Sequence, residues 1–201
     1  KAGASARAIR IHSGLRSGWA AMKAVCHAVR QPRATYLPAR STSPRPQFMT
    51  PRIVHGDLLD QPAQVLVNAW NRNIIPWWLL LPQGVSGAIR RRAGCAPFRE
   101  LGRMGPIPLG GAVLTGAGRL PCKALIHVAG ISLWWRASEA SIGQSVHSAM
   151  RLVNEHGFAS VAFPLIGAST GGFGAEGSLR VMLSAFETIE SAAEGTVVRY
   201  R

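Results

Sequence analysis

The chain has 201 residues, of which 47% are hydrophobic, and its formal net charge is +14. This length suits one α/β domain with an appendage, and the hydrophobic content is sufficient for a buried core. The stretch 73–89 contains no charged residue but is interrupted by prolines and glycines, so it lacks the about 20 consecutive apolar residues of a membrane-spanning helix. Three scattered cysteines show no metal-site or disulfide spacing. We therefore predict a cytoplasmic protein with no membrane segment, metal or cofactor.

The first 48 residues differ in composition from the rest of the chain. They contain nine of the 23 Lys and Arg residues and none of the nine Asp and Glu residues. Three interpretations stay open: an organelle transit peptide, a disordered arm that binds nucleic acid through its phosphates, or a segment outside the working protein. We favour the last, because a coherent domain begins at Met49. We thus predict an arm over residues 1–48 and a domain over residues 49–201.

After residue 50, strand-like and helix-like segments alternate. Runs of β-branched residues bounded by Gly, Asp or Pro predict strands, and apolar residues at helical spacing predict helices. This alternation predicts an α/β fold, a sheet with helices on both faces. The predicted strands are residues 52–56, 64–69, 112–116, 123–130, 160–165 and 196–200; the predicted helices are 84–94, one between the N-cap Ser138 and Gly157, and 177–195.

Two groups of residues follow predicted strands, at the edge where such sheets bind ligands. Asn68 and Asn71 end the strand 64–69. Their amides can bond ribose hydroxyls or cap loop backbone. The glycine-rich stretch GASTGGFG, residues 167–174, follows the strand 160–165. Its backbone N–H groups can approach a phosphate beside a helix N-terminus, although a plain flexible loop is the alternative.

Four motifs in order resemble the macro domain family, whose members bind ADP-ribose. The resemblance covers about residues 52–200. It implies a three-layer α/β/α fold with a mixed central sheet of about six strands, and the chain stops where the family usually adds another helix. The motifs are GDLLDQPAQVLVNAWN (56–71), GVSGAIRRRAG (84–94), GGAVLTGAGRLPCKALIHVAG (110–130) and VAFPLIGASTGGFG (161–174).

The resemblance also implies roles for individual residues. Asp57 is expected to hold the adenine amine, although a turn aspartate is the alternative reading of that residue alone. Gly84 and Val85 are expected beside the diphosphate and the distal ribose, and residues 169–174 as the second phosphate loop. Phe173 is expected to lie against the distal ribose. The predicted ligand-binding residues are Asp57, Leu58, Asn68, Asn71, Gly84, Val85, Ser169, Thr170, Gly171, Gly172, Phe173 and Gly174.

The leading hypothesis is a protein that binds ADP-ribose or an ADP-ribosylated protein, and we favour an enzyme over a binding module. It would hydrolyse mono-ADP-ribose from acidic side chains or deacylate O-acetyl-ADP-ribose, with Asn71 and Ser86 as the predicted catalytic residues. Ser86 stands where hydrolytic members often have aspartate, and a serine is not a general base unaided. The alternatives are a non-catalytic reader of ADP-ribose and a nucleic-acid-associated protein acting through residues 1–48.

Two further features leave alternatives open. The segment IIPWWLLLPQ, residues 74–83, replaces the glycine run of the family. It is either a stiff wall or lid near the distal ribose, with Trp77 or Trp78 facing the ligand, or a turn that fills core or a dimer contact. His127 lies inside an apolar strand, which favours a core histidine with satisfied hydrogen bonds over a catalytic one.

Overall fold

The computed structural model describes residues 47–79 and 83–200. Most of the predicted arm, and residues 80–82 of the segment 74–83, lie outside these residues. Gln47–Phe48 form a short strand, β1, which pairs antiparallel with β7, Glu190–Ser191. The description below concerns this single unit.

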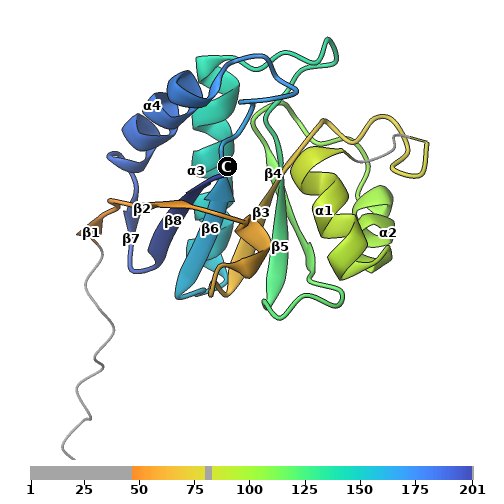
Figure 1. Ribbon diagram of the computed structural model, residues 1–201, viewed down its shortest axis with the longest axis horizontal. Coiled ribbons are helices and arrows are strands. Elements are labelled where there is room, and N and C mark those ends of the chain that lie inside the picture. The colour runs from red at the N-terminus through yellow and green to blue at the C-terminus, as the bar shows by residue number, and fades with distance from the viewer. Residues whose placement is uncertain (1–46, 80–82, 201) are drawn as a thin grey trace, which may run out of the picture. The chain divides into compact units, whose positions relative to one another are not determined.

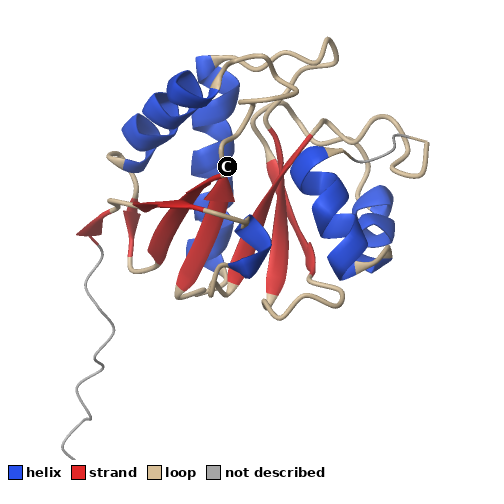
Figure 2. Cartoon of the chain, viewed as in Figure 1, coloured by secondary structure: helices blue, strands red, loops and turns tan. Residues whose placement is uncertain are grey.

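A six-stranded mixed sheet forms the middle layer (Figures 1 and 2). Its strand order is β2-β8-β6-β3-β5-β4, and all neighbours are parallel except β4 and β5, which are antiparallel. The strands are β2, Arg52–His55; β3, Val65–Trp70; β4, Ala112–Gly116; β5, Ala124–Ala129; β6, Ser160–Pro164; and β8, Glu194–Arg199.

Helices cover both faces of the sheet (Figure 1). The helices α3, Glu139–Glu155, and α4, Ala175–Phe186, pack on one face. The helices α1, Gly84–Ala93, and α2, Ala96–Arg103, pack on the other with the short 3₁₀ helix η1, Leu58–Asp60. The predicted three-layer arrangement and the six-stranded mixed sheet are confirmed.

The strand β3 shows why the sheet is buried on both sides. Val65 and Val67 join the core under α3 and α4, whereas Leu66 and Trp70 join the core under α1 and α2. Successive side chains of a strand point to opposite faces, so a strand covered on both faces is almost continuously apolar. Asn68 interrupts this pattern on the α1 and α2 face and is fully buried.

The predicted helix 177–195 is wrong in its second half, because α4 ends at Phe186. The following residues are drawn into contacts with α3: Ser191 Oγ donates to Asn154 Oδ1 over 2.6 Å, and Asn154 Nδ2 donates to Glu190 O over 2.9 Å. Alanines in the stretch SAAEG favour a helix locally, but these tertiary hydrogen bonds and the pairing of β7 override that preference. The sequence reading also missed α2.

Candidate ligand-binding site

A cavity of about 480 Å³ lies beyond the carboxyl ends of β3, β5 and β6, and we call it the carboxyl-edge cavity. The connections that follow these strands lie on the same side of the sheet (Figure 1). The N-terminus of α1 forms one wall and the loop after β6 forms another. The structure brings these predicted residues together around it: Asn71, Gly84, Val85, Ser86, Ser169, Thr170 and Gly171.

In the residues that the structure describes, the backbone donors of the first turn of α1 have no acceptor, and they line the cavity. The first hydrogen bond at this end joins Gly87 N to Gln83 O, and no side chain caps the helix. The N–H groups of Gly84, Val85 and Ser86 therefore have no partner within the helix. Together with the positive end of the helix dipole, such donors favour an anion.

The loop after β6 presents a second set of donors. In the described part of the chain, no acceptor bonds the backbone N–H groups of Ser169, Thr170 and Gly171. The loop is held in shape by other bonds: Phe173 N donates to Gly167 O, and Ala137 N donates to Gly171 O. A side chain at Gly171 would bring a Cβ within 2.7 Å of Gly167 O. Glycine is therefore required here, and the free N–H groups are fixed in place.

The carboxyl-edge cavity contains no ionisable side chain among its described lining residues. Its polar groups are the two sets of backbone N–H donors, together with the amides of Asn71 and Gln83 and the hydroxyls of Ser86, Ser169 and Thr170. Such a wall attracts an anion through dipoles and donates hydrogen bonds to it. It provides no carboxylate or imidazole to act as a general base.

Asn71 has one half of its amide available to a ligand. Its Oδ1 accepts a hydrogen bond of 2.7 Å from Asn73 N, which fixes the side chain at the end of β3. In the described residues, Asn71 Nδ2 makes no hydrogen bond, and the residue lines the cavity. The structure thus leaves an oriented donor at this position.

A buried chain of hydrogen bonds runs from the cavity along the face of the sheet that α1 and α2 cover. Ser86 Oγ donates to Asn68 Oδ1 over 2.7 Å, and Asn68 Nδ2 lies 2.9 Å from His127 Nδ1. His127 Nε2 lies 2.8 Å from Thr115 Oγ1, which itself lies 3.2 Å from Gly116 O. Every donor meets an acceptor when Nδ1 accepts and Nε2 carries the proton. The chain links α1, β3, β5 and β4 on one face of the sheet.

His127 is a core residue in this network. Complete burial lowers the pKa of His127 to about 3, so the imidazole is neutral at pH 7. The ring also packs edge-on against Phe98 at a centroid distance of 5.9 Å. A neutral ring with both nitrogens occupied is not free to transfer protons in the cavity.

Asn68 was predicted as a ligand-binding residue but does not line the cavity. Its amide is bonded to Ser86 and His127, and its side chain is fully buried. Its observed contact with the cavity is therefore through Ser86. In the sequence, two asparagines in the strand end NAWN look alike, and only the strand face separates them.

The other predicted residues outside the cavity lining belong to neighbouring surfaces. Asp57 is half-buried; it caps η1 through Leu59 N at 2.9 Å and lies 3.7 Å from Arg92 Nη1. Leu58 is a core residue under α1. Gly172 and Gly174 are exposed glycines with positive φ. The Phe173 ring lies over Gly177 of α4, where an added Cβ would meet it at 3.1 Å.

The two tryptophans of the segment 74–83 do not line the carboxyl-edge cavity. Trp77 packs on Phe98, with ring centroids 6.2 Å apart, and Trp78 is 65% exposed. Leu79 and Trp135 are instead among the large apolar residues that line the cavity. The sequence reading missed Trp135, which lies in the loop after β5 with a positive φ of 57°. The pair Trp134–Trp135 just after a predicted strand was the available signal.

Comparisons with known proteins agree with this architecture. A family model described as "Macro domain" matches residues 67–182. The chain belongs to the macro domain family. An O-acetyl-ADP-ribose deacetylase of Citrobacter rodentium is 39% identical over 132 residues, which cover 61% of this chain and 68% of that protein. A Streptomyces griseus protein described as macro domain-containing is 37% identical over 154 residues, covering 71% of this chain and 83% of that protein.

Solved structures show the same fold. The Oceanobacillus iheyensis macrodomain with ADP aligns with a TM-score of 0.65 and 21% identity over 77% of this chain and 86% of its own. A Trypanosoma brucei macrodomain in complex with ADP also aligns with a TM-score of 0.65, covering 74% of this chain and 63% of that chain. At 21% sequence identity, the similarity to these structures shows the fold alone.

Within the described residues, no helix has the length and apolar character needed to cross a membrane. No group of three or more His, Cys, Asp or Glu side chains in this part of the chain is placed to hold a metal ion.

Proposed function

We propose that this protein binds ADP-ribose, or an ADP-ribose derivative, in the carboxyl-edge cavity. The observation that carries the proposal is the pair of free donor sets, at the N-terminus of α1 and in residues 169–171. A diphosphate between them would receive hydrogen bonds from both walls, and it would lie on the positive end of a helix dipole. The volume of about 480 Å³ falls in the usual range for small-molecule sites.

The two ends of the ligand are assigned from the family resemblance and from the free polar groups. We expect Asn71 Nδ2 to donate to the distal ribose, because it is the oriented amide donor at the end of β3. We expect Asp57 to accept from the adenine amine. One of its oxygens already accepts from Leu59 N, which orients the carboxylate and leaves lone pairs for the base.

An esterase-type reaction is the catalytic extension of this proposal, by analogy with the O-acetyl-ADP-ribose deacetylase of Citrobacter rodentium. A water molecule near Asn71 and Ser86 would add to the ester carbonyl carbon. Its proton would pass to an oxygen of the ligand's own diphosphate. The bond between the carbonyl carbon and the ribose oxygen would then break, the ribose oxygen would take that proton back from the diphosphate, and acetate would be released. In this route the diphosphate of the ligand acts as the general base. The route therefore needs no ionisable side chain, and none is among the described residues that line the cavity.

A non-catalytic reader is the second candidate, and Ser86 favours it. Its hydroxyl is already donating to Asn68 Oδ1, and it stands where a carboxylate is frequent in hydrolytic members. The nucleic-acid interpretation belongs to residues 1–48, so it concerns a segment separate from the proposed domain over residues 49–201.

Two measurements on the full chain test these proposals in order. Titration calorimetry with ADP-ribose is expected to show one binding site, and an absence of binding would refute the function. Turnover is then measured with O-acetyl-ADP-ribose and with a protein mono-ADP-ribosylated on glutamate. Binding of ADP-ribose without release of product from either substrate would establish the reader and reject the enzyme.

A further inference from the structure

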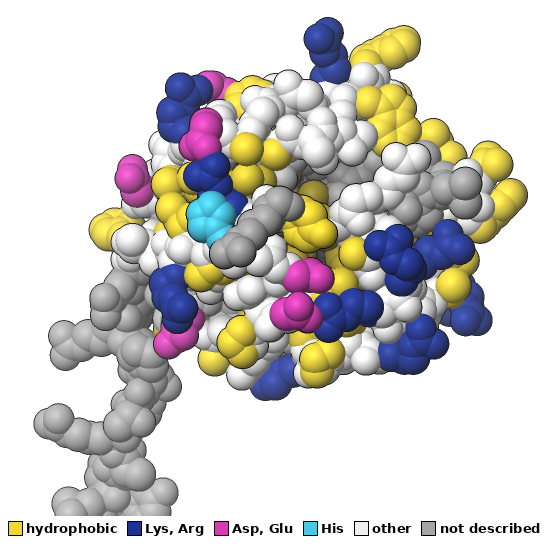
Figure 3. Space-filling view, viewed as in Figure 1, with side chains coloured by type: hydrophobic (Ala, Val, Ile, Leu, Met, Phe, Trp, Pro, Cys, Tyr) yellow, Lys and Arg dark blue, Asp and Glu magenta, His cyan; other side chains and the backbone are white. Residues whose placement is uncertain are grey.

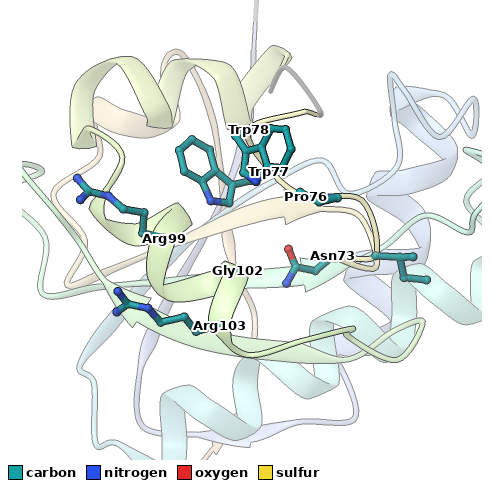
Figure 4. A pocket seen from close by; sticks show the side chains of 8 residues that line it. Asn73, Pro76, Trp77, Trp78, Arg99, Gly102 and Arg103 are labelled. Carbon is teal, nitrogen blue, oxygen red and sulfur yellow. The ribbon is translucent and has the colours of Figure 1, made fainter.

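A second cavity of about 350 Å³ lies beside α2, and we call it the arginine–tryptophan cavity (Figure 4). Trp77 and Trp78 line one side, and Arg99 and Arg103, one helical turn apart on α2, line another. Asn73 lies at a third side. The proposed ADP-ribose site uses none of these side chains.

The walls of this cavity are held in place by specific contacts. Asn73 has a positive φ of 53°, and its Nδ2 donates to Leu101 O and Gly105 O at 2.9 Å each. These bonds tie the loop after β3 to the end of α2. Gly102 leaves room for the Trp77 ring, because a Cβ added at position 102 would lie 3.2 Å from Trp77 Cδ1. The other side of Trp77 meets Phe98 and the Arg90 guanidinium, 6.0 Å from the ring centroid.

The arginine–tryptophan cavity is positively charged. No carboxylate lines it, and in the described residues neither Arg99 nor Arg103 is within ion-pair distance of one. Glu100, the acidic residue of α2, is occupied by Gly116 N at 2.9 Å on the β4 side. Lys and Arg side chains gather over this side of the molecule (Figure 3). Guanidinium groups bind carboxylates through paired hydrogen bonds. An aromatic side chain beside such a pair strengthens these hydrogen bonds by excluding water.

One loop separates the two cavities. Asn71 and Leu79 line the carboxyl-edge cavity, whereas residues 73, 74 and 76–78 between them line the arginine–tryptophan cavity. In the proposed function the modified residue lies near Asn71, and Asn71 directly precedes this loop. The exposed Ile74 and Leu79 make the crest of the loop apolar.

We propose that the arginine–tryptophan cavity receives an acidic side chain of the protein that carries the ADP-ribose. This inference rests on the proposed function, since it places the modified residue at the distal ribose end. The acidic residue would lie near the modified residue in the substrate. A single-stranded nucleic acid fits less well, because it needs a track of cations along several nucleotides, and here two guanidinium groups adjoin an apolar crest.

The experiment compares binding of three probes to the full chain by calorimetry. The first is free ADP-ribose; the other two are peptides carrying ADP-ribose through a non-hydrolysable linkage, flanked by glutamates in one and by glutamines in the other. We expect the glutamate peptide to bind about tenfold more tightly than the glutamine peptide. In Arg99→Gln/Arg103→Gln this preference should vanish, while the affinity for free ADP-ribose stays unchanged.

The matched control is Arg151→Gln/Arg180→Gln, which removes the same charge from exposed positions on α3 and α4. It should keep the preference for the glutamate peptide. Equal binding of the two peptides to the wild type, with free ADP-ribose still bound, overturns this inference alone. Failure to bind free ADP-ribose overturns the proposed function and this inference together. Tight binding of a thymidine oligonucleotide that Arg99→Gln/Arg103→Gln abolishes, with no peptide preference, would assign the cavity to nucleic acid instead.

Discussion

At the scale of single residues, the carboxyl-edge cavity presents mainly main-chain donors to a ligand. The donors at Gly84–Ser86 and at Ser169–Gly171 belong to the backbone, so exchanging a side chain does not remove them. A side chain matters here through what it adds to the cavity. A negative charge at an exposed position of the loop Ser169–Gly171 would lie beside its donors and repel a diphosphate.

Thr170 provides the sharpest test of this property. It is exposed on the loop after β6 and lines the cavity, so Thr170→Glu should fold normally and weaken ADP-ribose binding at least about tenfold, or about 1.4 kcal/mol. Thr170→Gln has the same size without the charge and should lose much less. Calorimetry measures both affinities. Similar affinities for the two variants would show that the diphosphate does not lie at this loop.

Ser86 connects the cavity to the buried hydrogen-bond chain. The donors and acceptors of this chain can exchange roles, so that every hydrogen bond is reversed. With a carboxylate at position 86, Asn68 Nδ2 can donate to it, His127 Nδ1–H can donate to Asn68 Oδ1, and Thr115 O–H can donate to His127 Nε2. Each group keeps a partner after the amide turns and the imidazole changes tautomer. Position 86 also lies in the first turn of α1, where a negative charge is favourable.

We therefore expect Ser86→Asp to fold and, in the enzyme interpretation, to raise turnover of O-acetyl-ADP-ribose by about 10²-fold, the size of a typical general-base contribution. Ser86→Asn is the control, because it has the same shape and no charge. Product formation at saturating substrate is the measurement. Equal turnover by the two variants would mean that position 86 does not face the reacting ester.

At the scale of elements, α3 shows how a local signal in the sequence becomes structure. Ser138 Oγ accepts from Ser141 N at 3.1 Å, while Ser138 N donates to Ser141 Oγ at 2.9 Å. This capping box satisfies donors that the first turn leaves free. The predicted N-cap at Ser138 is confirmed.

Ser138→Ala should lower the free energy of unfolding by about 1 kcal/mol, the usual effect of losing an N-cap side chain. Urea unfolding followed by circular dichroism measures the change. Ser184→Ala, at an exposed position of α4, is the control and should change stability by less than about 0.5 kcal/mol. A cap contribution is rejected if the two variants unfold at the same urea concentration.

The elements that sequence reasoning found are those whose signal is local and periodic. The predicted strand 112–116 has the same bounds as β4, and the predicted helix 84–94 differs from α1 by one residue. The missed α2, APFRELGR, is short, contains proline and glycine, and depends on burying Phe98 and Leu101. Its stability comes from packing, which a pattern of eight residues does not reveal.

The candidate site, like the fold, could be predicted only in part from the sequence. The order of motifs predicted which strand ends border the carboxyl-edge cavity, because carboxyl ends of parallel strands meet at one edge. The roles of Trp77 and Trp135 depend on contacts between segments far apart in the chain. Trp77 is drawn away from the cavity by Phe98 and Gly102 of α2, an element absent from the sequence reading. No local pattern in the sequence identifies which of the two aromatic pairs, 77–78 or 134–135, contributes a residue to the lining of the carboxyl-edge cavity.

At the scale of the whole molecule, the buried chain through His127 couples folding stability to pH. His127 packs between the sheet and α2, where its direct polar neighbours are Asn68 and Thr115 and its ring meets Phe98. No charged side chain bonds it, so burial alone lowers the pKa of His127, to about 3. An unfolded histidine has a pKa of about 6.5. Between these two values the unfolded chain binds a proton that the folded protein excludes.

The sign of the effect follows from this difference. Above pH 6.5 the stabilisation is complete; as the pH falls toward 3, the free energy of unfolding should fall by up to about 1.4 kcal/mol per pH unit, or about 2 kcal/mol between pH 7 and pH 5. Urea titrations at pH 7, 6 and 5 measure this slope. Carboxylates contribute to it as well, so the decisive quantity is the difference from His127→Gln, which should lack the histidine share although it is less stable overall. If His127→Gln and the wild type lose stability in parallel from pH 7 to pH 5, then His127 is protonated in the folded protein and the hydrogen-bond chain does not hold it neutral.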